Sequence, residues 1–330
     1  MMNRLKKALE ALESSDLDQI DMARTRALLK AYDHHYGHID LKATAVEQQV
    51  AVELHRSPWK FVGAIDTLCR DGSGNNVMVE HKTTSLDVSN LSSPYFTTLS
   101  FNLQISAYHM AQELLGDPIS QTVYDVVRKP TTKPKAIPRG SEGRLGTRSE
   151  IEECGTYYGH SVPVDSENIP DFETFELYEH RLMHMFIADK EKYFVRYGQI
   201  RRSRNDIIDT YEFLNDMVED IERCRERNVW HMNGSSCQQY GSSCEYLSLC
   251  RGVDSPDSDA WVKREGSSLS GSENLSCSRI RCFQSCPRKH YWRYEYGIER
   301  RRERSQALRV GSAFHLAMEA WWGIEVKEAV

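Results

Sequence analysis

The sequence predicts an α/β protein, with strands and helices following one another along the chain. Segments 61–69 (FVGAIDTLC) and 75–84 (NNVMVEHKTT) are rich in β-branched and apolar residues. They flank the turn-forming run RDGSGNN, so they predict a hairpin. A helical pattern follows at 97–116 and another short strand at 120–130, where Pro130 ends it. Strands that alternate with helices in this way indicate the class.

The other segments complete the predicted architecture in chain order. Residues 2–34 predict one or two helices, the Pro/Gly/Ser/Thr-rich 131–170 a long loop or insertion, and 172–229 a long helical stretch. The last block predicts a short helix, an aromatic-rich helix and a final amphipathic helix. We divide the chain into 1–265, a Gly/Ser linker at 266–272 (GSSLSGS), and a helical segment at 273–330.

The composition is that of a soluble globular protein. Of its 330 residues 40% are hydrophobic and 27% charged, and no apolar run approaches the roughly 20 residues that cross a bilayer. The N-terminal stretch does not resemble a secretion signal, so we expect a cytoplasmic protein without membrane partners. Nine cysteines then favour free thiols or a metal centre over disulfides. Proteins that bind nucleic acids usually carry a net positive charge, so the net charge of −6 does not indicate such a partner. Residues 279–309, however, carry a local surplus of basic side chains.

The predicted hairpin brings charged side chains together. Glu80 and Lys82 point to the same face because side chains alternate along a strand. If the turn is symmetric about Ser73, Asp66 lies opposite Glu80. Two such carboxylates repel each other unless a cation lies between them or one of them takes up a proton. Mg²⁺ is a hard ion with oxygen ligands and fits this demand. Lys82 could then orient a water for phosphodiester hydrolysis. The alternative is a cross-strand salt bridge on a solvent-facing sheet.

In order and approximate spacing, GAID, EHK and QISAY resemble the motifs of the PD-(D/E)XK nuclease superfamily, specifically its RecB-like branch. The resemblance implies a restriction-endonuclease-like core, in which a mixed central sheet is flanked by helices, with helical and iron–sulfur additions. It also implies Asp66 and Glu80 as ligands of Mg²⁺ or Mn²⁺, Lys82 as the catalytic lysine, and Gln104 and Tyr108 as supports for the lysine and the DNA strand. In their own right, Gln104 and Tyr108 could be ordinary half-buried helix residues.

Three cysteines, Cys237, Cys244 and Cys250, lie close together without the CxxC spacing of a zinc finger. A fourth ligand would complete either an iron–sulfur cluster or a zinc site. The chain resembles RecB-like nucleases of the AddB type and the CRISPR-associated type, which implies a 4Fe–4S cluster. Its fourth ligand would be Cys286 in SCPRKHYWRY, with Cys282 as a competitor.

The same resemblance implies His315, in GSAFH, as a third metal ligand, although a lone helical histidine is often structural. In the family the CPxxY-like and histidine segments normally come first, whereas here they come last. The Gly/Ser run would then join a native C terminus to a native N terminus. We therefore predict a circular permutation, in which 273–330 completes the same domain.

Arginines and lysines alternate with aromatic residues in RIRCFQSCPRKHYWRYEYG. Aromatic rings stack on unpaired bases while cations bind phosphates, so the segment predicts a single-strand groove. The alternative places the rings in the core and the arginines in solvent. The predicted DNA contacts are Arg279, Arg281, Arg288, Lys289, Tyr291, Trp292 and Arg293.

We expect a metal-dependent DNA nuclease, a single-strand or end-directed exonuclease, in repair, recombination or phage DNA processing. Its partners would be DNA and a helicase or recombination protein. The alternative is a non-catalytic iron–sulfur DNA-binding subunit of a larger complex. The sequence has no GxxxxGK[ST] loop and therefore no ATP-driven motor of that kind.

Overall fold

The computed structural model describes residues 4–55, 58–141, 143–162, 168–239, 241–264, 273–301 and 306–323. The predicted linker at 266–272 lies outside the described residues. Within them, none of the helices combines the length and the apolar character needed to cross a membrane.

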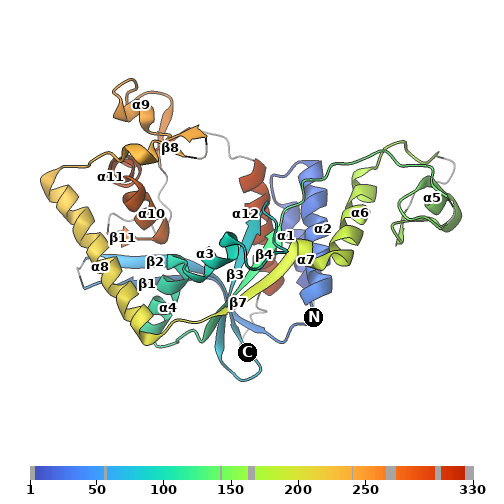
Figure 1. Cartoon of the computed structure of the whole chain (residues 1–330), viewed down its shortest axis with the longest axis horizontal. Coiled ribbons are helices and arrows are strands. Elements are labelled where there is room, and N and C mark those ends of the chain that lie inside the picture. Colours follow the sequence, from blue (N-terminus) through green and yellow to red (C-terminus); the bar gives the residue numbers. More distant parts are fainter. Residues whose placement is uncertain are drawn as a thin grey trace, which may run out of the picture.

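A six-stranded sheet forms the centre of the molecule (Figure 1). Its strands follow the order β1-β2-β3-β4-β7, and β11 pairs with β2. The pairs β3–β4 and β11–β2 are parallel and the other pairs antiparallel, which confirms the predicted mixed sheet. The strands are β1 (Lys42–Glu53), β2 (Lys60–Arg70), β3 (Asn76–Thr84), β4 (Gln121–Arg128), β7 (Phe194–Ile200) and β11 (Asn274–Leu275).

The hairpin of β2 and β3 opens into a fork. Its register, from Arg70 opposite Asn76 to Thr67 opposite Val79, is the one predicted from symmetry about Ser73. Pairing stops at Thr67, one position before Asp66. Further along β2, Lys60 and Phe61 pair instead with β11. The two strands therefore separate where the predicted catalytic residues begin.

Helices cover both faces of this sheet, and side chains alternate between two cores. Leu68, Met78 and Val126 belong to one core, and their neighbours Cys69, Val79 and Val127 to the other, as strand geometry requires. The first core is covered by α4 (Leu103–Leu114), α8 (Arg204–Arg227) and α10 (Cys277–Ser285). The second is covered by α1 (Arg4–Glu13), α2 (Gln19–Tyr36), α6 (Phe175–Ala188) and α12 (Gln306–Trp322).

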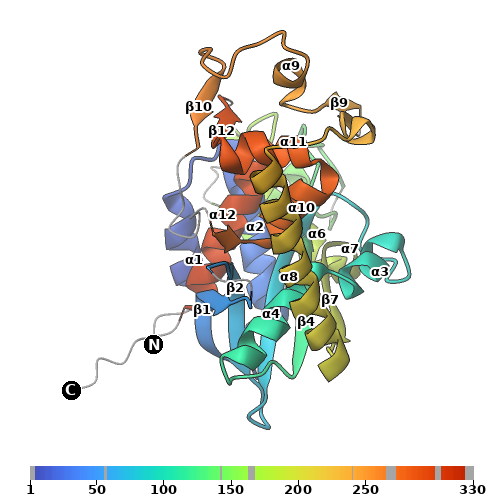
Figure 2. The same ribbon diagram turned by 90° about the vertical axis from the view of Figure 1, so that its left-hand side faces the viewer.

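The remaining elements are short. Around the sheet lie α3 (Pro94–Ser100), α5 (Arg148–Cys154), β5 (Thr156–Tyr157), β6 (His160–Ser161) and α7 (Lys190–Tyr193). The cysteine-bearing part contains a 3₁₀ turn (Gly234–Ser236), β8 (Gln238–Gln239), β9 (Ser242–Ser243), α9 (Leu247–Cys250), β10 (Trp261–Lys263), α11 (Pro287–His290), a π-helical turn (Tyr291–Glu295) and β12 (Ile298–Arg300). In Figure 2 this part lies at one end of the molecule, with α9 above α10 and α11.

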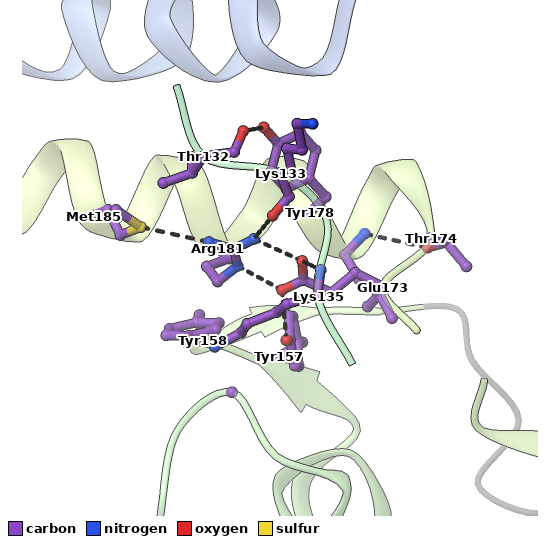
Figure 3. A network of polar contacts seen from close by, with 12 residues as sticks. Thr132, Lys133, Lys135, Tyr157, Tyr158, Glu173, Thr174, Tyr178, Arg181 and Met185 are labelled. Carbon is purple, nitrogen blue, oxygen red and sulfur yellow. Dashed lines mark hydrogen bonds and ion pairs between the residues drawn. The ribbon is translucent and has the colours of Figure 1, made fainter. Parts of the chain in front are cut away.

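The segment predicted as a loop at 131–170 contains structure of its own. It holds α5, the β5–β6 hairpin and a small apolar core. Figure 3 shows how it is fixed to α6: Arg181 pairs with the buried Glu173, which also accepts a hydrogen bond from Tyr157 at 2.8 Å. Arg181 donates a further bond to the carbonyl of Lys133 at 2.8 Å. These contacts fix the segment 131–170 to α6.

Two predictions of secondary structure were wrong. The stretch 172–229 is not one helical unit, because β7 interrupts it and pairs antiparallel with β4. Gly198, at φ +84°, gives that strand a backbone conformation that favours glycine. The edge of the sheet is formed by β1 at 42–53, where no strand was predicted.

Candidate active site

Asp66 lies at the fork between β2 and β3. Its Oδ2 accepts a hydrogen bond from the backbone N–H of His81 at 2.8 Å. The carboxylate thus occupies the position where the ladder between the two strands would have continued. The negative charge of Asp66 is also one cause of the raised pKa of Glu80. The predicted proximity of the two acids therefore holds, although they do not form a ladder pair.

Glu80 is the most buried of these charged groups, with 1% of the residue exposed. Its Oε1 accepts a hydrogen bond from Gln104 Nε2 at 3.2 Å and pairs with the ammonium group of Lys82. Its Oε2 is buried and has no hydrogen-bond partner in the described chain. Burial, and then the charge of Asp66, raises the pKa of Glu80 to about 7. The ion pair joins neighbours on one strand in the interior, unlike the solvent-facing cross-strand alternative.

Helix α4 supplies the polar side chains that face Glu80. Asn102 caps the start of the helix, and its side chain accepts a hydrogen bond from the N–H of Gln104 at 2.9 Å. Gln104 Nε2 also donates to the hydroxyl of Tyr108 at 3.2 Å. The i,i+4 spacing on one helical face makes this contact possible. The structure thus brings both predicted helix residues to the carboxylate of Glu80.

Gly63, three residues before Asp66, makes room for this arrangement. A Cβ atom at this position would lie 2.5 Å from Cε1 of Tyr108, well inside van der Waals contact. The ring is only 5% exposed, so it has little space into which it could move. The glycine of GAID therefore has a steric explanation, which is that it lets the tyrosine of QISAY lie against β2.

His315 reaches the site from α12. Its Nδ1 lies 3.8 Å from Oδ2 of Asp66, and its side chain is 35% exposed. Burial lowers its pKa, while the charge of Asp66 opposes that shift. A neutral imidazole is the form that binds metals. Segments more than 200 residues apart in the chain thus meet at this position.

We tested whether these residues fit a hard divalent cation. Two carboxylates and a neutral imidazole form a suitable donor set, and the partnerless Oε2 of Glu80 is a buried acceptor that a cation would satisfy. However, no group of three or more His, Cys, Asp or Glu side chains is arranged to hold a metal ion in the part of the chain that the structure describes. The donor types fit the ion, but among the described residues they form no preformed ligand shell.

A further acidic residue, Glu47, lies near the site and was not predicted from the sequence. The pairs Val46–Thr67 and Gln48–Ile65 in the β1–β2 ladder place Glu47 across from Asp66. Glu47 has a φ of +47°, which is uncommon for a residue other than glycine. Burial, together with the charges of Asp66 and Glu319, raises its pKa to about 7. The only signal in the sequence was an acid within an alternating segment, and its meaning depended on a strand that was not predicted.

Two of the four predicted cluster cysteines, Cys237 and Cys286, contact the backbone of Asn233. The backbone N–H of Asn233 donates to Sγ of Cys286 at 3.4 Å, and the thiol of Cys237 donates to the carbonyl of Asn233 at 3.7 Å. The pKa values of the Cys244 and Cys250 thiols are raised by burial, with a further contribution from Cys286. The thiol donors fit a cluster, although they form no preformed metal site among the described residues. Cys282 precedes Cys286 by one helical turn. Burial raises the pKa of the Cys282 thiol to about 11, and the charge of Cys286 contributes to this rise.

The predicted DNA contacts fall into two groups. Arg279 is 2% exposed and donates hydrogen bonds to Glu295 at 2.7 Å and to His290 at 3.0 Å. Arg288 donates to the carbonyl of Trp230 at 2.8 Å. Their surroundings favour structural roles, and we leave both out of the proposed DNA surface.

The other predicted DNA contacts are three cations that are exposed or half-buried and two aromatic residues that pack against hydrophobic cores. Arg281 is exposed, and Lys289 and Arg293 are half-buried. Tyr291 and Trp292 are half-buried and pack against the hydrophobic cores on either side. The rings therefore follow the structural alternative more closely than the three cations do.

A mixed sheet flanked by helices, with Asp, Glu and Lys at a fork of its central strands, defines the class of PD-(D/E)XK proteins. A family model described as PD-(D/E)XK nuclease superfamily matches residues 2–251 and 274–330. The match covers most of the chain, and the protein belongs to this superfamily. Membership implies a nuclease. A search of curated proteins finds no match.

Proposed function

We propose that the protein is a metal-dependent deoxyribonuclease of the RecB-like branch, which cuts single strands or strand ends. The environment of Glu80 is the observation that carries the proposal. A buried carboxylate with one partnerless oxygen, a second acid beside it and a raised pKa would be stabilised by a divalent cation. Asp66, Glu80 and His315 would hold Mg²⁺ or Mn²⁺. The ion would lower the pKa of a bound water and polarise the phosphate.

The protein side chains then have separate roles. Hydrolysis forms a bond from a water oxygen to phosphorus and breaks one P–O bond, and the leaving oxygen takes up a proton. Lys82, with 28% of its side chain exposed, can donate a hydrogen bond to the attacking water or to a phosphate oxygen. Gln104 links Glu80 to Tyr108 and so fixes the carboxylate.

Labelled single- and double-stranded DNA incubated with Mg²⁺ or Mn²⁺ tests the proposal. We expect the parent protein to cut, and Lys82→Ala to cut at least about 100-fold more slowly. Equal cutting by both proteins would contradict the catalytic role of Lys82. Lys6→Ala, on the exposed face of α1, is the control for the loss of a charge.

A second candidate is a non-catalytic DNA-binding subunit. The pairing of Lys82 with Glu80, and the lack of a preformed ligand group among the described residues, favour it. Binding of DNA without cutting in Mg²⁺, in Mn²⁺ and across pH 6–9 would support this candidate.

We also propose a 4Fe–4S cluster on Cys237, Cys244, Cys250 and Cys286. The meeting of both cysteine segments at Asn233 supports it. Anaerobic purification should give a brown protein whose iron and sulfide contents are equal. One zinc per chain and no visible absorbance would instead indicate the alternative metal.

We propose, finally, that the chain is circularly permuted. In support, the family match has two parts on either side of the Gly/Ser run, β11 pairs with β2, and His315 lies beside Asp66. A rearranged chain in which 273–330 precedes 1–265 should fold and retain the activity of the parent. Insoluble or inactive protein would contradict the proposal.

A further inference from the structure

A basic cavity of about 410 Å³ lies beside the candidate active site. Its walls come from four separate segments: the cysteine loop, the end of β10, α10, and the turn that follows α11. Figure 2 shows α10 and α11 next to each other beneath β10. The charged and aromatic residues that line the cavity are Glu245, Arg264, Arg281, Lys289, Arg293 and Tyr294.

Positive charge exceeds negative charge in this cavity. Of its four cations, Arg293 lies 3.7 Å from the single acid, Glu245. No carboxylate of the described chain forms an ion pair with Arg264, Arg281 or Lys289. Like charges that share one cavity repel each other. An anion bound there would reduce this repulsion and would itself be attracted to the cations.

An aromatic ring holds two of the guanidinium groups. The ring of Tyr294 lies 4.7 Å from the guanidinium of Arg264 and 6.0 Å from that of Arg293. A cation–π contact uses the face of the ring and leaves the N–H donors of arginine available. The planar fork of arginine donors matches the oxygens of a phosphate group better than it matches a halide or another point anion.

Arg281 connects the cavity to the catalytic carboxylate. Its Nη2 donates to Oε1 of Gln104 at 3.4 Å, and Nε2 of Gln104 donates to Glu80 at 3.2 Å. Only two side chains therefore separate the cavity from the group proposed to hold the metal. An anion in the cavity would lie within reach of the same strand whose phosphate is cut at Glu80.

We propose that this cavity is a binding subsite for a second phosphate group of the substrate strand, near the phosphate that is cut. Arg281, Lys289 and Arg264 bind the oxygens of this phosphate. Arg293 binds the phosphate more weakly, because its charge is partly neutralised by Glu245. The proposal rests on the nuclease function, and it adds a position that fixes where along the strand the cut falls. The bound group is either an internal phosphodiester or a terminal phosphate.

The test measures binding separately from cutting. Fluorescence anisotropy of 3′-labelled single-stranded oligonucleotides is recorded in EDTA with the Lys82→Ala protein. Arg281→Gln or Lys289→Gln should weaken binding about fivefold to tenfold and reduce the slope of log K against log salt by about 0.7 for each lost phosphate contact. Arg281→Lys, which keeps the charge, should retain the slope. Lys6→Gln, which removes one exposed charge on α1, should bind the oligonucleotide as tightly as the Lys82→Ala protein without this change.

Modified strands identify the phosphate. If a terminal phosphate binds, oligonucleotides with a 5′-phosphate should bind more tightly than those with a 5′-hydroxyl, and Arg281→Gln should remove the difference. If an internal phosphodiester binds, a neutral methylphosphonate at one position of the strand should weaken binding to the parent protein but not binding to Arg281→Gln. Either result supports the subsite. Unchanged affinity and salt slope in both Arg281→Gln and Lys289→Gln would overturn it. Parent protein that shows these binding effects but never cuts DNA would refute only the nuclease function.

Discussion

The contact between Gly63 and Tyr108 gives a strict test of how the site is built. In Gly63→Ala the new methyl group would lie 2.5 Å from Cε1 of the tyrosine, where carbon atoms normally stay about 3.5–4.0 Å apart. The ring must therefore move by about 1 Å. Overpacking of this kind costs about 1–3 kcal/mol, which corresponds to a fall in Tm of roughly 2–6 °C for a domain of this size.

The displacement should affect cutting more than stability. The hydroxyl of Tyr108 accepts a hydrogen bond from Gln104 at 3.2 Å, and a shift of 1 Å would break it. Gln104 would lose the support that orients it toward Glu80. Misplacement of a catalytic group by about 1 Å can cost about 100-fold in rate. We expect Gly63→Ala to lower kcat by about tenfold to 100-fold.

Matched variants separate this explanation from a general effect of alanine on the backbone. Gly234→Ala adds a methyl group with nothing within 4 Å, so its Tm and kcat should stay close to those of the parent. Combining Gly63→Ala with Tyr108→Leu should recover part of the lost Tm but not the rate, because the ring is gone. Thermal unfolding and single-turnover cutting provide both readouts. Parent-like Tm and kcat in Gly63→Ala would refute the steric argument.

Four further predictions concern the charged groups and the cysteines. Mg²⁺ should raise Tm because it binds only the folded site, and Glu80→Gln should abolish this increase, as measured with and without EDTA. In the metal-free protein, burial raises the pKa of both Glu80 and Glu47 to about 7 from the model-compound value of 4.5. The native state then holds protons that the unfolded chain releases, so the free energy of unfolding should fall as pH rises from about 4.5 to 7; denaturant titrations at several pH values that show a rise would contradict this. Glu47→Gln should raise Tm at pH 8 without metal because it removes the repulsion from Asp66 and Glu319, and an unchanged or lower Tm would argue against that repulsion. Cys286→Ser should lose the visible absorbance of the proposed cluster, whereas Cys154→Ser, at an exposed cysteine outside that region, should keep it.

Local patterns determined much of this protein. The turn run RDGSGNN and its flanking β-branched residues were enough to predict the β2–β3 hairpin and its register, because strand pairing around a short turn is a local property. The helix with Gln104 and Tyr108 followed from its apolar spacing and its terminating glycine. Its predicted start at 97 was wrong, because α4 begins at Leu103 after an Asn102 cap and the residues before it end the separate helix α3. The charged motifs, in their order, also indicated the superfamily that the family match shows.

Only the tertiary structure decided which distant groups meet. The edge strand β1 was not recognised, and β7 was assigned to a helix, because the pairing that stabilises a strand depends on partners far away in the chain. For the same reason Glu47 could not be placed opposite Asp66, and Arg279 could not be known to be buried against Glu295. Periodicity reports which face of an element is apolar, whereas the partner of that face is chosen by the packing of the whole chain. The sequence thus specified the residue types of the candidate site, and the fork between β2 and β3, with α4 and α12 beside it, brought them together.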